Sequence, residues 1–154
     1  METDKKRYLD LLLLADEQED MVDRYLERGT MYVLEDDGVK AECVVTDEGD
    51  RILELKNIAV EPADQGKGYG KALIDFLIET YAGQYTVLQV GTGDSPSIIP
   101  FYEACGFRRH HLVGEKVLDQ MVPAKATGLI KQDGGRTVSG AHLQHRILSC
   151  IGFD

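Results

Sequence analysis

The most constraining feature of this 154-residue chain is a short segment with three glycines and two lysines, Gln65-Gly66-Lys67-Gly68-Tyr69-Gly70-Lys71. It lies between a run with strand chemistry that ends at Val60 and a run with helical periodicity that continues to Tyr81. A helix start offers unpaired N–H groups and the positive end of the helix dipole, and glycines let an anion approach the backbone closely. The segment therefore indicates an anion site, with a glycine-rich turn that merely starts a helix as the alternative.

Two widespread phosphate-binding motifs do not fit this segment. The P-loop requires Ser or Thr after its lysine, whereas Lys71 is followed by Ala72. The dinucleotide fingerprint G-x-G-x-x-G fails by one residue, because Gly66 and Gly68 are followed by Gly70.

Hydrophobic periodicity and turn residues divide the chain into elements. We expect helical structure over residues 4–28 with a break at Asp16, strands over 31–34, 39–46 and 51–60, a helix over 68–81, a strand over 85–90, and a helix over about 98–105 capped by Ser97. Phe107 onward is expected to form a further strand, 116–136 a loop, and 142–151 a final strand. A strand–helix–strand step makes two strands parallel, so the expected fold is α/β (α+β) with a mixed sheet and helices on its faces.

Composition and charge exclude several classes of protein. The longest apolar run, residues 11–15, is too short for a membrane span or a signal peptide. The net charge of −10 argues against nucleic-acid binding; it suits a cationic substrate, although it also serves solubility alone. Three cysteines without zinc-ligand spacing indicate a reduced, cytoplasmic protein.

The glycine-rich segment also meets the pattern Gln/Arg-x-x-Gly-x-Gly/Ala through Gln65, Gly68 and Gly70. With the preceding run 55–62 and the later run Phe101-Tyr102-Glu103-Ala104-Cys105-Gly106-Phe107, it resembles the GCN5-related N-acetyltransferase (GNAT) superfamily. The resemblance implies one domain over residues 1–154 with a mostly antiparallel sheet, splayed between its two central parallel strands.

The resemblance implies that acetyl-CoA is the acyl donor and lies between the strands 51–60 and 85–90. The backbone of the first strand would bind the pantetheine arm, and the amides of the glycine-rich segment the pyrophosphate. The residues implied in donor binding are Ile58, Ala59, Val60, Gln65, Gly66, Lys67, Gly68, Tyr69, Gly70, Lys71 and Ser95. Capping of the following helix explains Ser95 equally well.

The implied chemistry is direct attack of an amine on the thioester in a ternary complex, with no nucleophile from the protein. Tyr102 matches the family tyrosine that donates a proton or a hydrogen bond to the CoA sulfur; a core aromatic residue is the alternative. Glu54 is the candidate base, and the alternative is a solvated strand residue facing Lys56. A small primary amine is the expected acceptor and a homodimer the suggested assembly, with a non-catalytic acyl-CoA sensor as the rival function.

No metal site is expected, because the adjacent His110 and His111 point to opposite faces of a strand without an acidic ligand. The resemblance covers residues 8–110 and fades beyond them. The charge changes at the same place: residues 1–107 hold 10 basic and 23 acidic side chains, and residues 108–154 hold 7 and 4. Two hypotheses remain for residues 111–154: a divergent tail specific to the acceptor, or a segment that is not the native continuation, for example after a reading-frame change.

Overall fold

The computed structural model describes residues 8–15, 19–91, 98–112, 115–125, 130–133, 136–139 and 143–150. The helices are α1 (Leu9–Ala15), α2 (Glu19–Leu26), the short 3-10 helix η2 (Pro62–Asp64), α3 (Tyr69–Thr80) and α4 (Ile99–Ala104). The strands are β1 (Thr30–Glu35), β2 (Val39–Asp47), β3 (Ile52–Val60), β4 (Val87–Gly91), β5 (Arg108–Leu112), β6 (Glu115–Met121), β7 (Ile130–Asp133), β8 (Arg136–Ser139) and β9 (Leu143–Cys150). None of the described helices has the length and apolarity needed to cross a membrane.

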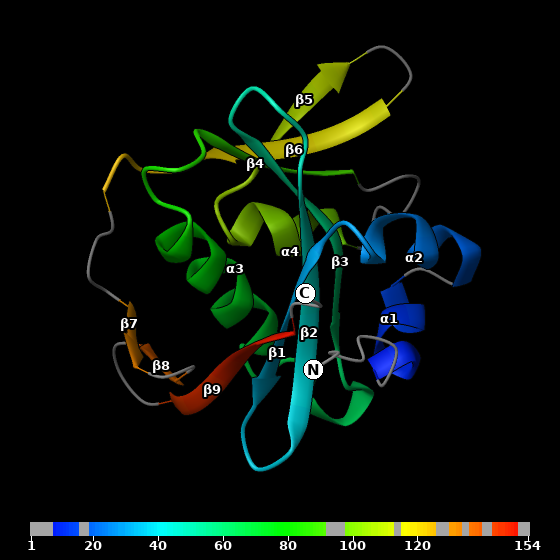
Figure 1. The fold of residues 1–154 in the computed structure, drawn as a ribbon, viewed down its shortest axis with the longest axis vertical. Coiled ribbons are helices and arrows are strands. Elements are labelled where there is room, and N and C mark those ends of the chain that lie inside the picture. Colours follow the sequence, from blue (N-terminus) through cyan, green and yellow to red (C-terminus); the bar gives the residue numbers. More distant parts are fainter. Residues whose placement is uncertain are drawn as a thin grey trace.

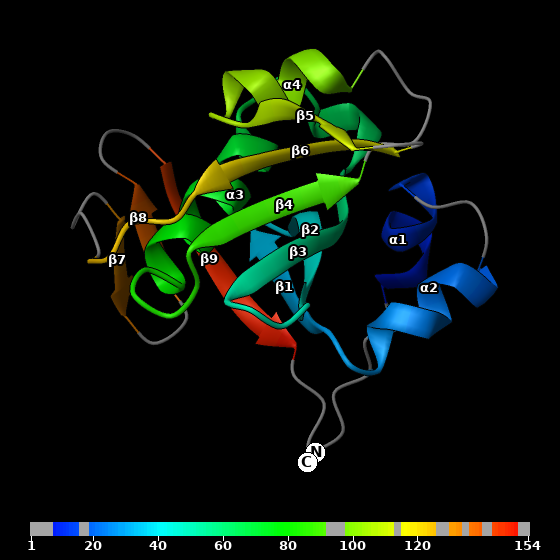
Figure 2. The ribbon, with the colours of Figure 1, turned by 90° about the horizontal axis from the view of Figure 1, so that it is seen from above.

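The described strands form one sheet in the order β5-β6-β4-β3-β2-β1-β9-β8-β7. β3 and β4 are the parallel pair among them, and the other neighbours are antiparallel. Helices α3 and α4 cover one face of the central strands, and α1 and α2 lie on the other (Figures 1 and 2). This arrangement confirms the predicted mixed sheet with helices on both faces.

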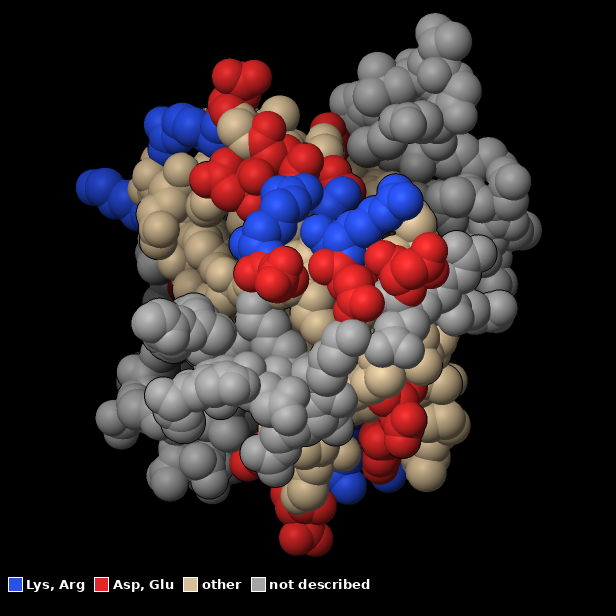
Figure 3. Space-filling view, turned by 45° about the vertical axis from the view of Figure 1, so that its right-hand side comes forward, with Lys and Arg blue, Asp and Glu red and all other residues tan. Residues whose placement is uncertain are grey.

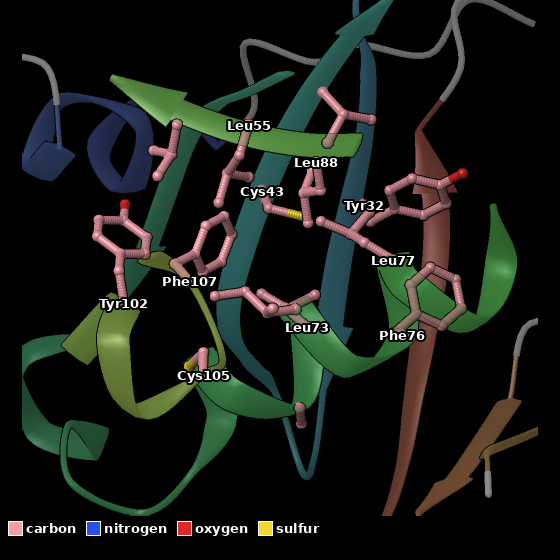
Figure 4. Close-up of a cluster of buried hydrophobic side chains, with 14 of the residues drawn as sticks. Tyr32, Cys43, Leu55, Leu73, Phe76, Leu77, Leu88, Tyr102, Cys105 and Phe107 are labelled. Carbon is pink, nitrogen blue, oxygen red and sulfur yellow. The ribbon is translucent and has the colours of Figure 1, made fainter. Parts of the chain in front are cut away.

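Each face of the sheet has its own hydrophobic core. The core under α3 and α4 includes Leu73, Leu77 and Leu88, and Figure 4 shows these side chains between the helices and the strands. The core under α1 and α2 is smaller and centres on Leu12 and Val22. Because the two cores are separated by the sheet, alternate residues of β2 and β3 face different environments.

The parallel strands β3 and β4 pair over only part of their length. Their register runs from Ile52–Val87 to Leu55–Val90, whereas β3 continues to Val60. The chain therefore opens a gap beside the second half of β3, which confirms the predicted splay.

A β-bulge lies in β3 where this gap begins. Val45 of β2 pairs with Leu55, but the preceding Val44 pairs with Asn57, so Lys56 is an extra residue. An inserted residue leaves the ladder locally disrupted and re-aims the strand. The bulge also shifts the alternation, so that Ile58 packs on the same core as Leu55.

The predicted loop over residues 116–136 is wrong. The structure has β6 and β7 there, with β6 hydrogen-bonded between β4 and β5. Its sequence carries a weak strand signal, and among the side chains described for this strand, 118–121, Leu118 is the one in the hydrophobic core. Pairing on both sides, rather than an alternating pattern, holds this strand in place.

Two other expectations concern the helix α4 and the last strand. The N-cap position of α4 is Ile98 rather than Ser97, which lies outside the described residues; Pro100 is in the first turn as expected. The predicted final strand is confirmed as β9, whose backbone pairs with β1. The side chains of residues 143–150 lie outside the described part.

Candidate functional site

A cavity of about 800 Å³ opens where β3 and β4 diverge. Its walls come from the end of α1, the second half of β3, the glycine-rich segment, the start of α3, the end of β4, and α4. The lining residues are Leu14, Ala15, 55–60, Gln65, Gly66, 68–71, Val90, Gly91, Ile98, Phe101, Tyr102, Ala104 and Cys105. The cavity therefore brings together both sequence landmarks, the glycine-rich segment and the run that contains Tyr102.

The start of α3 has the form of an anion cradle. Gly66 and Gly68 have φ values of 82° and 92°, which side chains rarely adopt, and a Cβ at either position would meet no atom within 4 Å. Gly68 is the N-cap of α3 and supplies no side-chain hydrogen bond to the first turn. The first N–H groups of this helix therefore have no side-chain cap, and the open space at Gly66 and Gly68 leaves room for an anion.

The two landmarks touch each other at Gly70. A Cβ at this position would lie 2.9 Å from Cζ of Phe101, closer than such atoms pack. A glycine here lets α4 approach the first turn of α3, which brings the neighbouring Tyr102 to the cavity.

The lysines of the glycine-rich segment are paired with nearby carboxylates. Lys67 Nζ lies 3.1 Å from Asp64 Oδ1, and Lys71 Nζ lies 2.8 Å from Asp75 Oδ2. Lys71 lines the cavity, whereas Lys67 is absent from its lining. Lys and Arg side chains also gather beside Asp and Glu on the face in Figure 3. Local pairing leaves the backbone N–H groups as the principal anion donors of this segment.

Two further residues of the segment hold it in position. The Tyr69 hydroxyl donates to Asp36 Oδ2 at 2.7 Å, and this hydrogen bond raises the pKa of Tyr69 to about 12. Gln65 Nε2 donates to the carbonyl oxygen of Val60 at 3.2 Å. The first contact ties the start of α3 to the β1–β2 turn, and the second ties the segment to the end of β3.

Tyr102 extends from α4 toward the strands and is 5% exposed (Figure 4). Its ring packs edge-on against Phe101 and Phe107, with centroids 5.2 and 5.4 Å away. Burial raises the pKa of Tyr102 well above its usual value, so the phenol stays protonated at neutral pH. Burial likewise raises the pKa of the neighbouring Cys105 to about 11, which leaves this residue a thiol.

Glu54 is outside the lining of the cavity. Its carboxylate lies 2.8 Å from Lys56 Nζ and accepts a hydrogen bond of 2.7 Å from Gln89 on β4. Lys56, the bulge residue, does line the cavity. The Glu54 carboxylate is thus linked to the cavity only through its ion pair with Lys56. This ion pair is the contact expected from the alternative interpretation of Glu54 as a strand residue that faces Lys56.

Glu42 on β2 is a functional candidate that the sequence reasoning missed. Its side chain is fully buried on the face covered by α1 and α2, and neither carboxyl oxygen has a hydrogen-bond partner among the residues that the structure describes. Burial without a compensating charge raises the pKa of Glu42 well above its usual value. The signal in the sequence is a single charged residue inside the apolar run Ala41-Glu42-Cys43-Val44-Val45.

The Glu42→Gln variant is expected to be more stable than the parent, by a margin that grows as the pH rises above 4.5. A carboxyl whose pKa is raised by folding binds its proton more tightly in the native state, so the parent loses stability as the pH rises toward that raised pKa. Urea unfolding at pH 5, 6, 7 and 8 measures the margin. Glu48→Gln is the control, because the pKa of Glu48 is lowered and its removal cannot reproduce this trend. Parallel pH curves for the parent and Glu42→Gln contradict the expectation.

The remaining predicted site residues fall into two groups. Ile58, Ala59 and Val60 line the cavity, as the predicted pantetheine contacts require. Ser95 lies outside the described residues, as do the side chains of His110 and His111. Among the described residues no group of His, Cys, Asp and Glu has the arrangement of a metal site.

Other lining residues were also missed. Leu14 and Ala15 reach the cavity from α1, a contact that only the tertiary fold creates. The bulge had a sequence signal, since the apolar residues Leu53, Leu55, Ile58 and Val60 contain one spacing of three among spacings of two.

Comparisons with known proteins agree with this geometry. A family model for an acetyltransferase (GNAT) domain matches residues 27–109. The N-acetyltransferase YvbK of Bacillus subtilis is 42% identical over 112 residues, which cover 70% of each chain. A crystal structure of a Bacillus subtilis acetyltransferase in complex with CoA has a TM-score of 0.69 at 30% identity, covering 79% of this chain and 95% of that one. A GNAT family acetyltransferase from Elizabethkingia anophelis with acetyl-CoA bound has a TM-score of 0.66 at 26% identity, covering 73% and 89%.

Proposed function

This chain belongs to the GNAT acetyltransferase family and is an acetyl-CoA-dependent N-acetyltransferase, and from that premise we propose how it works. Residues 1–154 act as one domain that moves the acetyl group of acetyl-CoA to a primary amine of a small molecule. The amine attacks the thioester directly in a ternary complex. The predicted cytoplasmic location and homodimer stay predictions.

The observation that supports this proposal is one continuous cavity with three features. It contains the uncapped start of α3, the part of β3 beyond Leu55 where the pairing with β4 has ended, and the buried Tyr102. An N-terminal helix end suits the pyrophosphate, and a free strand edge offers backbone groups to the amide-containing pantetheine arm. The diphosphate, the pantetheine arm and the sulfur of one acyl-CoA would each find a matching feature in this cavity.

Tyr102 and the β3 bulge supply the chemistry in this proposal. The thioester of acetyl-CoA provides the activated acetyl group and leaves as a thiolate. The Tyr102 hydroxyl, which is protonated at neutral pH, donates a proton or a hydrogen bond to that sulfur. Backbone groups left unpaired at Lys56 stabilise the charge on the thioester oxygen during attack. Glu54 accepts the amine proton through water, next to Lys56.

The test is release of CoA thiol from acetyl-CoA with a panel of small primary amines. Turnover that depends on the amine, with the acetylated amine identified by mass spectrometry, is the expected result. Tight binding of acetyl-CoA with no thiol release for any amine contradicts the proposal and favours the acyl-CoA sensor. Acetylation of a peptide lysine with no activity on small amines contradicts the choice of acceptor and leaves the donor site intact.

A further inference from the structure

Glu42 shares its face of the sheet with a second under-satisfied polar group. Asn57 on β3 is 3% exposed, and its Nδ2 donates to the carbonyl oxygen of Leu12 and to the Tyr25 hydroxyl, at 3.0 and 2.9 Å. Its Oδ1 accepts no hydrogen bond from the described part of the chain. Buried polar atoms in proteins are nearly always paired, so three unpaired acceptor atoms on one face indicate a missing donor.

Asn57 lines the cavity, and the fully buried Glu42 lies next to it on the neighbouring strand. Glu42 pairs across the strands with Ala59, and Asn57 lies two positions from Ala59 on the same face. Asn57 and Ala59 both line the cavity, as do Leu14 and Ala15 of α1, which packs over these strands. Diagonal neighbours on antiparallel strands lie roughly 7–8 Å apart, a distance that one small donor group can bridge between two side chains. Since Ala59 carries only a methyl group, little side chain separates Glu42 from the cavity.

The chemistry of the three acceptor atoms defines the donor they lack. Two belong to a carboxyl group and one to an amide oxygen, so the ligand must supply several N–H or O–H groups. None of the ion pairs among the described residues includes Glu42. An ammonium group supplies both the hydrogen bonds and the ion pair that Glu42 lacks, because it carries three N–H donors and a charge opposite to that of a carboxylate.

The position of Glu42 shows that an ammonium group bound there is not the amine that reacts. The gap proposed to hold acetyl-CoA borders β3, whereas Glu42 is on β2, one strand further away. Neighbouring strands lie about 4.8 Å apart, so a group held on Glu42 is at least that far from the thioester at the edge of β3. An ammonium group bound at Glu42 is therefore at one end of the substrate that accepts the acetyl group, and the amine at the other end of that substrate reacts.

We propose that Glu42 and Asn57 form a subsite for a second, non-reacting ammonium group, and that the preferred acceptors are aliphatic diamines. This inference rests on the proposed function, because it assumes that the acceptor is an amine. When the acceptor binds, Glu42 gives up the proton that burial favours, and its carboxylate gains a counter-charge from the ammonium group.

The kinetic test compares 1,4-diaminobutane with butylamine, which has the same chain without the second ammonium. The parent is expected to show a kcat/KM at least about 10-fold higher for the diamine, and Glu42→Gln to abolish this preference through the KM of the diamine alone. Glu48→Gln removes the same charge from the far end of β2, where Glu48 pairs with Arg28 at 2.9 Å, and is expected to keep the preference. Equal kcat/KM values for the two amines in the parent, or an unchanged ratio in Glu42→Gln, overturn the subsite while the acetyltransferase function stands.

A binding test separates the subsite from the reaction. Without acetyl-CoA, 1,4-diaminobutane is expected to raise the Tm of the parent and of Glu48→Gln, but not that of Glu42→Gln, and butylamine to raise none of them. Glu42→Met provides a second variant of similar length if the amide is not tolerated. If neither amine is acetylated but this Tm pattern holds, the proposed function fails and the subsite stands. Identical Tm responses in the parent and both Glu42 variants mean that a buried water pairs these atoms, which overturns the subsite.

Discussion

Tyr102→Phe is expected to lower kcat for amine acetylation by about 100-fold or more and to change the KM for acetyl-CoA little, since general acids contribute effects of this size. The substitution keeps the ring packed against Phe101 and Phe107 and removes only the hydroxyl. That hydroxyl makes no hydrogen bond within the described part of the chain, so the fold loses no internal partner. The loss therefore reports on proton donation to the departing sulfur.

The measurement is a rapid-quench single turnover, because product release can hide a slower chemical step. Tyr85→Phe is the matched control, since its hydroxyl donates to Asp47 at 3.0 Å away from the cavity, and near-parental turnover is expected. The parent is also expected to keep its rate well into the alkaline range, because the pKa of Tyr102 is raised by burial. A single-turnover rate for Tyr102→Phe equal to that of the parent removes Tyr102 from the mechanism.

Gly68→Asp is expected to weaken CoA binding at least about 10-fold relative to Gly68→Asn, while making the protein no less stable. Both side chains are strained by the positive φ of 92°, and to a similar degree, while neither new Cβ meets an atom within 4 Å. They are nearly equal as helix N-caps, and a carboxylate favours a helix start. The same carboxylate repels a diphosphate bound at the first turn of α3, and placing like charges together costs several kcal/mol.

Isothermal titration with CoA and thermal unfolding measure the two effects in the same samples. Gly68→Asn is the control for the change of backbone residue, since it differs from Gly68→Asp in charge alone. A lower CoA affinity together with an unchanged or higher Tm indicates a local effect of the charge, because a variant that folds poorly loses both affinity and Tm. Equal CoA affinity in the two variants places the diphosphate away from this helix end.

The sequence predicted the elements up to Phe107 closely, because their signals are local. Helix periodicity in residues 68–81 and continuous apolar character in 85–90 depend only on neighbours in the chain. Strand β6 depends instead on pairing with β4 and β5, so a patchy sequence between Lys116 and Pro123 was taken for a loop. The segment differs from the earlier strands in that pairing on both sides, rather than an alternating apolar pattern, keeps it in the sheet.

The candidate site divides in the same way. Gly66, Gly68 and Tyr102 could be singled out because their roles follow from motifs, and the structure brings all three to one cavity. Glu42 has no motif, and its interest comes from complete burial without a partner. Such a property exists only after β1, β2 and β3 are assembled beneath α1, so no reading of neighbouring residues reveals it.

Because of the bulge at Lys56, the two faces of β3 serve two different molecules, the acyl carrier and the acetyl acceptor. Beyond it, Ile58 and Val60 turn to the core under α3, whereas Asn57 turns to α1 and hydrogen-bonds Leu12. Substitutions on one side of this strand leave the other side's neighbours unchanged. Proteins with such a strand can therefore change their acetyl acceptor through substitutions on one face, while the site for the acyl carrier on the other face stays the same.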